Sequence, residues 1–147
     1  MAVRKTGFEG STPRWGFAVT PQEIFERHVR AGMTRDAEAQ AGLYTPDGVF
    51  EAPLMPEGTG YPRRLEGRAA LRDGFAEMHR RAAADQRVVD FARSRYVLHT
   101  TADPDVFIVE LDTAFVDAEP MALVQIFRLR DGEIALMRDY FSPEIVL

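Results

Sequence analysis

The stretch that decides the fold is EIALMRDYFSP, residues 133–143, which follows a turn at Asp131 and Gly132. Alternate residues share one face of the strand that this stretch predicts, namely Ala135, Met137, Asp139 and Phe141. A carboxylate between a methionine and a phenylalanine on a sheet face is what a small apolar reaction pocket would need. The same pattern also fits a surface strand that carries a single charge.

The turn before this strand admits two registers with the strand that precedes it. In a two-residue type I′ turn Asp139 lies opposite Val124, whereas in a three-residue loop it lies opposite Leu123. We favour the three-residue loop, because it separates the arginines from the apolar side chains. The inward face would then carry Leu123, Gln125, Phe127, Met137, Asp139 and Phe141.

The composition is that of one globular domain: 147 residues, 46% hydrophobic and 28% charged. A net charge of −5 argues against binding to a nucleic-acid backbone. There is no cysteine, and the three histidines (His28, His79 and His99) show no metal-binding spacing. No apolar run is long enough to span a membrane. We therefore expect a cytoplasmic protein with no cofactor or metal and no nucleic-acid or membrane partner.

The chain divides into an N-terminal arm or lid, residues 1–19, and a single domain, residues 20–147. The tetrapeptide Thr20-Pro21-Gln22-Glu23 predicts a helix start, because threonine can cap, proline suits the first turn and glutamate completes a capping box. In the helix that follows, His28 falls on the same stripe as Phe25 and therefore faces the interior.

Further helices are expected over residues 35–44 and about 68–84, with a strand over residues 49–53 between them. The remainder, from residue 86 onward, alternates as a series of strands. This order predicts an α+β domain whose helices lie on one face of a curved sheet.

Three segments carry a family resemblance: LYTPDGVFEAP (43–53), RLEGRAALRDGF (64–75) and FRLRDGEIALMRDYFSP (127–143). They resemble the nuclear transport factor 2-like superfamily, in its SnoaL-like and ketosteroid-isomerase-like branch. The resemblance implies a cone-shaped α+β barrel, in which about three helices pack on the concave face of a mostly antiparallel sheet. It also implies a pocket for a small-molecule substrate between helices and sheet, and a homodimer formed through the outer face of the sheet.

The resemblance to ketosteroid isomerase does not extend to its catalytic groups. The isomerase's base aspartate corresponds to Ala52, its phenol on the first helix to His28, and its protonated carboxylic acid to Gln125. Because the base is replaced by alanine, steroid isomerisation by the family's route is not expected.

A partial similarity to limonene epoxide hydrolase concerns two carboxylates. The last-strand aspartate of that enzyme corresponds to Asp139, and a second aspartate corresponds to Asp112. Its arginine is replaced by Glu110, and its water-positioning tyrosine and asparagine fall near Phe50 and Ala52. The two acids are therefore kept without the groups that surround them in that enzyme.

We therefore predict a cofactor-independent pocket enzyme that moves protons on a largely apolar substrate, with secondary metabolism as the expected context. The reaction would be a cyclisation, an isomerisation, a dehydration or an epoxide opening. The predicted catalytic residues are Asp139, Asp112 and His28. The predicted substrate-binding residues are Gln125, Phe50, Ala52, Leu54, Met121, Leu123, Phe127, Met137, Phe141 and Trp15. The alternative is a non-catalytic ligand-binding protein or dimer scaffold of the same fold.

Overall fold

The computed structural model describes residues 2–5 and 19–147, with side chains from residue 19 onward. Its helices are α1 (Pro21–Met33), α2 (Ala37–Ala41) and α3 (Arg68–Ala84). Its strands are β1 (Ala2–Lys5), β2 (Tyr44–Glu51), β3 (Arg64–Glu66), β4 (Val88–Val89), β5 (Arg95–Thr100), β6 (Val106–Val116), β7 (Ala118–Arg130) and β8 (Glu133–Tyr140). A short 3-10 turn, η1 (Pro143–Ile145), follows β8.

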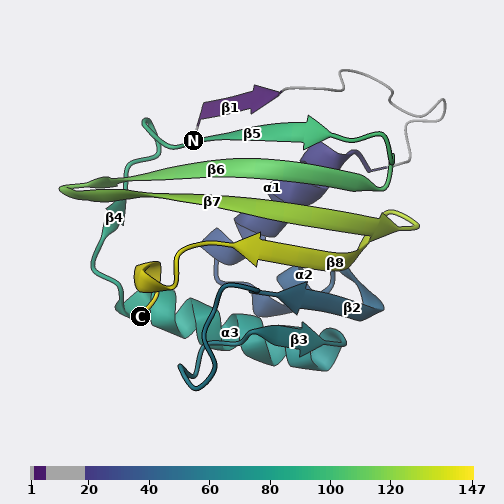
Figure 1. The fold of residues 1–147 in the computed structure, drawn as a ribbon, viewed down its shortest axis with the longest axis horizontal. Coiled ribbons are helices and arrows are strands. Elements are labelled where there is room, and N and C mark those ends of the chain that lie inside the picture. The colour runs from purple at the N-terminus through teal and green to yellow at the C-terminus, as the bar shows by residue number, and fades with distance from the viewer. Residues whose placement is uncertain (1, 6–18) are drawn as a thin grey trace.

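The strands form one mixed, curved sheet in the order β1-β5-β6-β7-β8-β2-β3, and β4 pairs with β6. The pairs β2–β8 and β1–β5 are parallel, and the other pairs are antiparallel. All three helices lie on the same side of the sheet, with α1 behind β6 and β7 and α3 along the β2–β3 side (Figure 1). The predicted α+β cone is confirmed.

The capping signal at the start of α1 is confirmed. Thr20 is the N-cap, its hydroxyl oxygen accepts a hydrogen bond from the Glu23 backbone N–H at 3.2 Å, and Pro21 is the first helical residue. One face of α1 is buried and includes Phe25 and His28, as the stripe predicts. The third helix also has the predicted bounds.

The second helix is shorter than predicted. It begins after Asp36, whose carboxylate accepts the Ala39 N–H at 2.9 Å, and it ends before Gly42. The predicted range ran to residue 44, but the Leu43 carbonyl already accepts a hydrogen bond from Ile134 of β8 at 2.9 Å. The chain therefore joins the sheet at Tyr44, five residues earlier than the predicted strand.

This early entry is possible because β2 contains an irregularity. Tyr44 pairs with Ile134 and Val49 pairs with Leu136, so the residues between Tyr44 and Val49 bulge out of the ladder. Beyond the bulge the strand is regular. Phe50 and Ala52 face the core, as the alternation predicts.

The β7–β8 hairpin corrects the favoured turn. Asp131 and Gly132 have φ values of +53° and +79°, and Arg130 pairs with Glu133. These are the features of a two-residue type I′ turn, so the three-residue loop was wrong. A type I′ turn requires positive φ at both central residues, and aspartate and glycine tolerate positive φ better than most residues.

A β-bulge then changes the register of the hairpin. Leu129 pairs with Ile134, but Arg128 pairs with Leu136, which leaves Ala135 as the extra residue of β8. Ala135 therefore does not share the face of Met137. Beyond the bulge Asp139 lies opposite Gln125, rather than opposite either residue that the two simple registers predict.

The bulge nevertheless produces the inward face that the wrong loop was chosen to explain. Shifting a strand by one residue exchanges its two faces, and a three-residue loop and a bulge both supply that shift. Gln125, Phe127, Met137, Asp139 and Phe141 are all buried, and Leu123 packs against the core. Arg138 points to the other face, where its guanidinium donates to Glu51 at 2.8 Å.

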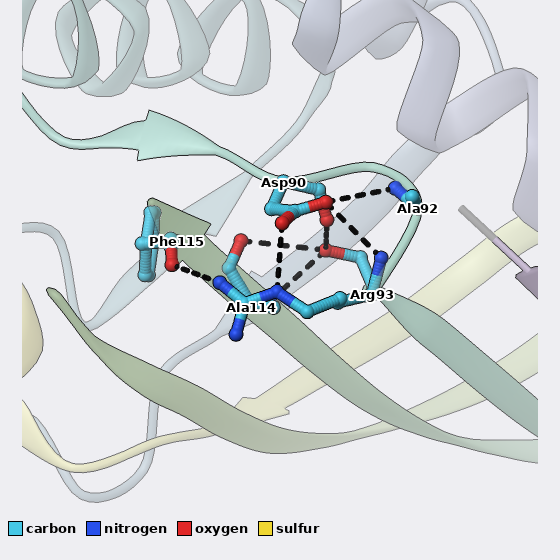
Figure 2. A network of polar contacts seen from close by, with 6 residues as sticks. Asp90, Ala92, Arg93, Ala114 and Phe115 are labelled. Atoms are coloured by element: carbon cyan, nitrogen blue, oxygen red, sulfur yellow. Dashed lines mark hydrogen bonds and ion pairs between the residues drawn. The ribbon is translucent and has the colours of Figure 1, made fainter. Parts of the chain in front are cut away.

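A hydrogen-bonded turn divides the strand predicted from residue 86 into β4 and β5. The Asp90 N–H donates to the Ala114 carbonyl at 2.8 Å, and the buried Ser94 hydroxyl accepts the Ala114 N–H at 3.0 Å (Figure 2). Arg93 donates to the Asp90 carboxylate at 2.7 Å and to the Phe115 carbonyl at 2.8 Å. The β6–β7 register shifts at Ala114, so this turn is attached where the sheet changes pairing.

The core lies between the helices and the concave side of the sheet, and it is rich in aromatic rings. Phe107 and Phe127 stack with centroids 4.6 Å apart, and Phe25 meets Tyr96 edge-on at 4.5 Å. Among the described residues, no helix has the length and apolar character that crossing a membrane requires.

The bulge of β2 leaves no room for a side chain at Gly48. A Cβ added to Gly48 would lie 2.8 Å from the Tyr44 Cβ and within 3.1 Å of two backbone oxygens, which cannot rotate away. We expect Gly48→Ala to lower the free energy of unfolding by about 1–3 kcal/mol in a urea titration. The control is Gly32→Ala in α1, where the nearest atom would be 3.9 Å away. That change should be neutral or stabilising by up to about 1 kcal/mol. Equal effects of the two changes would contradict the packing at Gly48.

Candidate functional site

The site is organised by Asp139 on β8 and Gln125, its cross-strand partner on β7. Their side chains point to the concave side and are only 9% and 8% exposed. Asp139 Oδ1 and Gln125 Oε1 are both buried and have no hydrogen-bond partner within the described part of the chain. Buried polar oxygens are nearly always paired, so two neighbouring unpaired acceptors indicate a place where a donor from a water molecule or a ligand binds.

The environment of Asp139 sets its protonation. Burial raises the pKa of the Asp139 carboxyl from 3.8 to about 7, because the charged form loses its hydration. A hydrogen bond with the Gln125 side chain acts in the opposite direction and lowers the pKa. At neutral pH the group is therefore present in both forms, which suits a residue that accepts and donates protons.

The negative charge of Asp139 affects the pKa of two tyrosines, Tyr44 and Tyr61. Burial, and then the negative charge of Asp139, raise the pKa of Tyr44 and of Tyr61 above the ordinary phenol value. Both phenols are therefore protonated at neutral pH. The Tyr61 ring also packs against Phe141, two residues beyond Asp139, with centroids 5.7 Å apart.

A chain of side-chain hydrogen bonds runs from Tyr44 to the edge of α3. The Tyr44 hydroxyl lies 2.9 Å from His28 Nε2, and Gln40 Nε2 lies 3.4 Å from the same nitrogen. The carbonyl oxygen of Gln40 is 2.8 Å from His79 Nε2. In this arrangement Gln40 accepts from His79 and donates to His28, so the proton of His28 belongs on Nδ1. The Tyr44 hydroxyl then donates to His28 as well.

His28 within this chain is uncharged at neutral pH. Burial, and then the proximity of His79, lower the pKa of His28 from 6.5 to about 4. His28 was predicted as a catalytic donor that titrates near neutrality. The structure instead places it as a neutral acceptor that orients Tyr44.

A groove of about 790 Å³ lies between α3, the segment after β8 and the hairpin end of β6 and β7, where Thr113, Phe115 and Met121 line it. Its inner wall includes Tyr61 and Phe75, and Gln40 and His79 also line it. Asp139 is not a lining residue, but the Tyr61 ring, which lines the groove, packs against Phe141, two residues beyond Asp139.

The structure brings together most of the predicted site residues. Met121 lines the groove, and the others lie on the inward face or in the core beneath it. The residues so placed are Asp139, Gln125, His28, Phe50, Ala52, Leu123, Phe127, Met137, Phe141 and Met121.

Three predicted residues are not part of this cluster. Asp112 is exposed on the outer face, where its carboxylate lies 3.4 Å from Arg95, because the alternation of β6 points it away from the core. Leu54 is 55% exposed, and the turn after β2 buries Met55 in its place. Trp15 lies outside the described residues.

Sequence reasoning missed Tyr44, Gln40 and His79. Tyr44 was assigned to the end of a helix, whereas it is a fully buried residue of β2. The only available signal was the turn sequence Thr45-Pro46-Asp47-Gly48, which required the helix to end before it.

Comparison with known proteins agrees with this architecture. The family model described as a SnoaL-like domain matches residues 25–137. A PhzA/B-like protein of Pseudomonas aeruginosa is 32% identical over 127 residues, which cover 83% of this chain and 84% of that protein.

Two solved structures share the fold. A proposed isomerase from Bacillus subtilis has a TM-score of 0.65 and 25% identity, over 85% of this chain and 88% of that one. A proposed polyketide cyclase from Sinorhizobium meliloti has a TM-score of 0.53 and 23% identity, over 80% and 93% of the two chains. With its curved sheet, its concave-side pocket residues and the match over most of its length, this chain belongs to the SnoaL-like family of the nuclear transport factor 2-like superfamily.

Proposed function

We propose that the protein is a cofactor-independent enzyme in which Asp139 moves a proton on a small, largely apolar molecule. The observation that carries this proposal is a carboxyl group that is 9% exposed, has a pKa of about 7 and has one oxygen without a hydrogen-bond partner among the described residues. A buried carboxyl whose only role is structural would be expected to have its hydrogen bonds satisfied. Membership of a family with isomerase-like and cyclase-like relatives supports the same class of chemistry.

The proton steps follow from the two forms of Asp139. The carboxylate form can remove a proton from a carbon next to a carbonyl group, or from a hydroxyl group. The carboxylic acid form can return that proton to a carbon or to an oxygen of the product. Isomerisation, cyclisation, dehydration and epoxide opening all use such a pair of transfers. Asp112 is exposed and does not face Asp139, so a second carboxylate from β6 is not part of the proposal.

Gln125 and Tyr44 would hold the acid and the substrate in place. The unpaired Gln125 Oε1 can accept a hydrogen bond from a substrate hydroxyl or from protonated Asp139. The hydroxyl proton of Tyr44 points toward His28, so its oxygen presents lone pairs rather than a proton on its other side. Under this arrangement Asp139 is the group that supplies a proton to the substrate.

The function is tested by proton exchange on apolar cyclic ketones such as 2-tetralone in deuterated water. We expect the protein to accelerate exchange at the carbon next to the carbonyl, and Asp139→Asn to reduce the rate about 100-fold or more. The matched control is Asp112→Asn, which changes an exposed aspartate and should leave the rate unchanged. Exchange that survives Asp139→Asn would remove Asp139 from the mechanism. Binding of the ketones without any exchange would favour a non-catalytic ligand-binding protein.

The raised pKa of Asp139 predicts how its substitution changes stability with pH. The folded protein holds the Asp139 proton between pH 3.8 and about 7, where the unfolded chain has lost it. Because the unfolded chain releases this proton and the folded protein keeps it, the free energy of unfolding falls as pH rises through that window. Relative to the parent protein, Asp139→Asn should gain stability over the window, by up to about 1.4 kcal/mol for each pH unit.

Urea titrations of both proteins across this range measure the difference. The comparison must be made between variant and parent, because His28 has the opposite slope. Its folded pKa of about 4 is below 6.5, so its contribution to stability is present above 6.5 and is lost as pH falls. A difference that does not change with pH would show that Asp139 titrates normally.

The hydrogen-bond chain predicts the tautomer of His28. Nitrogen-15 NMR should show a neutral ring protonated on Nδ1, even at about pH 6, where an unperturbed histidine is largely charged. Gln40→Leu removes the amide that donates to His28 and should weaken the preference for this tautomer. A charged His28 at about pH 6, or a proton on Nε2, would contradict the direction assigned to the chain.

A further inference from the structure

We propose that Arg81 binds a carboxylate of the substrate, so that the ligand is a compact, mostly apolar molecule with one carboxylate at the end away from Asp139. This inference rests on the proposed function, because it assumes that the reacting end of the ligand reaches Asp139. It names a substrate class from the charges and shape of the groove.

The charges on α3 leave a guanidinium available at Arg81. Glu77 is the shared partner of two arginines: Arg80 pairs closely with one of its oxygens, and Arg81 Nε lies 3.4 Å from the other. One carboxylate beside two guanidinium groups leaves one positive charge uncompensated. Arg80 holds Glu77 at the shorter distance, and its pairing is the largest cause of the lowered pKa of Glu77. The uncompensated charge therefore falls mainly on Arg81.

Only one of these two arginines faces the groove. The Arg81 side chain lines it and is 37% exposed, whereas the Arg80 side chain is 73% exposed and is not part of the lining. The two arginines are adjacent and share Glu77, but their side chains point in different directions. Removing either one therefore removes the same charge from α3, but only the loss of Arg81 removes a charge from the groove.

The other charged groups of the groove are either neutralised or lie on its rim. Arg87 donates to the Asp85 carboxylate at 2.9 Å and 3.0 Å and to the Ile145 carbonyl at 3.1 Å. Desolvation lowers the pKa of His79, so it is mostly neutral at neutral pH. Glu144 is exposed on η1. Among the described lining residues, Arg81 is the cation best placed to receive an anion from the groove.

The Tyr61 ring is close to Arg81 and responds to the charge of Asp139. The Arg81 guanidinium carbon lies 5.9 Å from the centre of the Tyr61 ring, and Tyr61 packs on Phe141 beside Asp139. The pKa of Tyr61 responds to both charges, raised by Asp139 and lowered by Arg81. Tyr61 therefore connects the groove residue Arg81 with the surroundings of Asp139.

The remaining lining favours an apolar body and a single carboxylate. Phe75, Met78, Phe115 and Met121 supply an apolar surface along the groove. A guanidinium binds a carboxylate through two parallel hydrogen bonds, which one arginine can provide alone. A phosphate dianion would ordinarily require further donors, and no other uncompensated cation lines the groove among the described residues.

The test compares two probes of nearly the same shape, the anionic 2-naphthoate and the neutral 2-naphthamide, by calorimetric titration. We expect the parent protein to bind the carboxylate about tenfold or more tightly than the amide. Arg81→Gln should abolish this preference, and Arg81→Lys should restore part of it, because lysine keeps the charge but not the paired donors. Arg80→Gln is the matched control and should keep the preference.

Three results would overturn the proposal. One is a parent protein that binds both probes equally, and another is an Arg81→Gln variant that keeps the preference. The third is an Arg80→Gln variant that loses as much as Arg81→Gln, which would mean that only the overall charge of α3 matters. Circular dichroism and thermal unfolding of each variant establish that the fold is intact. Asp139→Asn should keep the carboxylate preference, so failure of the anchor and failure of the proposed catalysis give different results.

Discussion

The burial of Asp139 depends on one extra residue in β8. The type I′ turn at Asp131 and Gly132 sets a register that would turn Asp139 outward, and the bulge at Ala135 reverses it. The inward side chains of β8 beyond Ala135 follow from that reversal, including the pairing of Asp139 with Gln125. A strand has only two faces, so a single inserted residue is enough to move a carboxylate from solvent into the concave side of the sheet.

Desolvation is the physical cause that connects the polar groups of the site. It raises the pKa of Asp139 and of the two tyrosines nearby, and it lowers the pKa of His28. Each group is thereby shifted toward its neutral form, so the interior tolerates a polar cluster without a buried ion pair. Of these groups, Asp139 has the pKa closest to pH 7, and it is therefore the one suited to exchange protons.

The family relationship accounts for the fold around this site, whereas the chemistry of the site depends on particular residues. The concave-side pocket is a property of the fold, which hosts many unrelated activities. Positions 50 and 52, where the sequence resemblance would place catalytic or water-positioning groups, hold phenylalanine and alanine. Among the described residues, the site consists of a buried acid with an amide beside it and a hydrogen-bond chain from Tyr44 to His79, and Arg81 lines the groove. The proposals above follow from these residues.

The sequence by itself determined the α+β order, the start of α1, the bounds of α3 and the inward face of the last strand. These follow from local signals, because caps, helical stripes and strand alternation act within a few residues. Only the tertiary structure decided that Asp112 faces solvent, that Tyr44 belongs to a strand, and that His28 is a neutral acceptor. The first depends on which face of β6 packs against the core, the second on the irregularity of β2, and the third on burial by distant segments. Short-range sequence patterns do not indicate these features, because each depends on contacts between segments that are distant in the sequence.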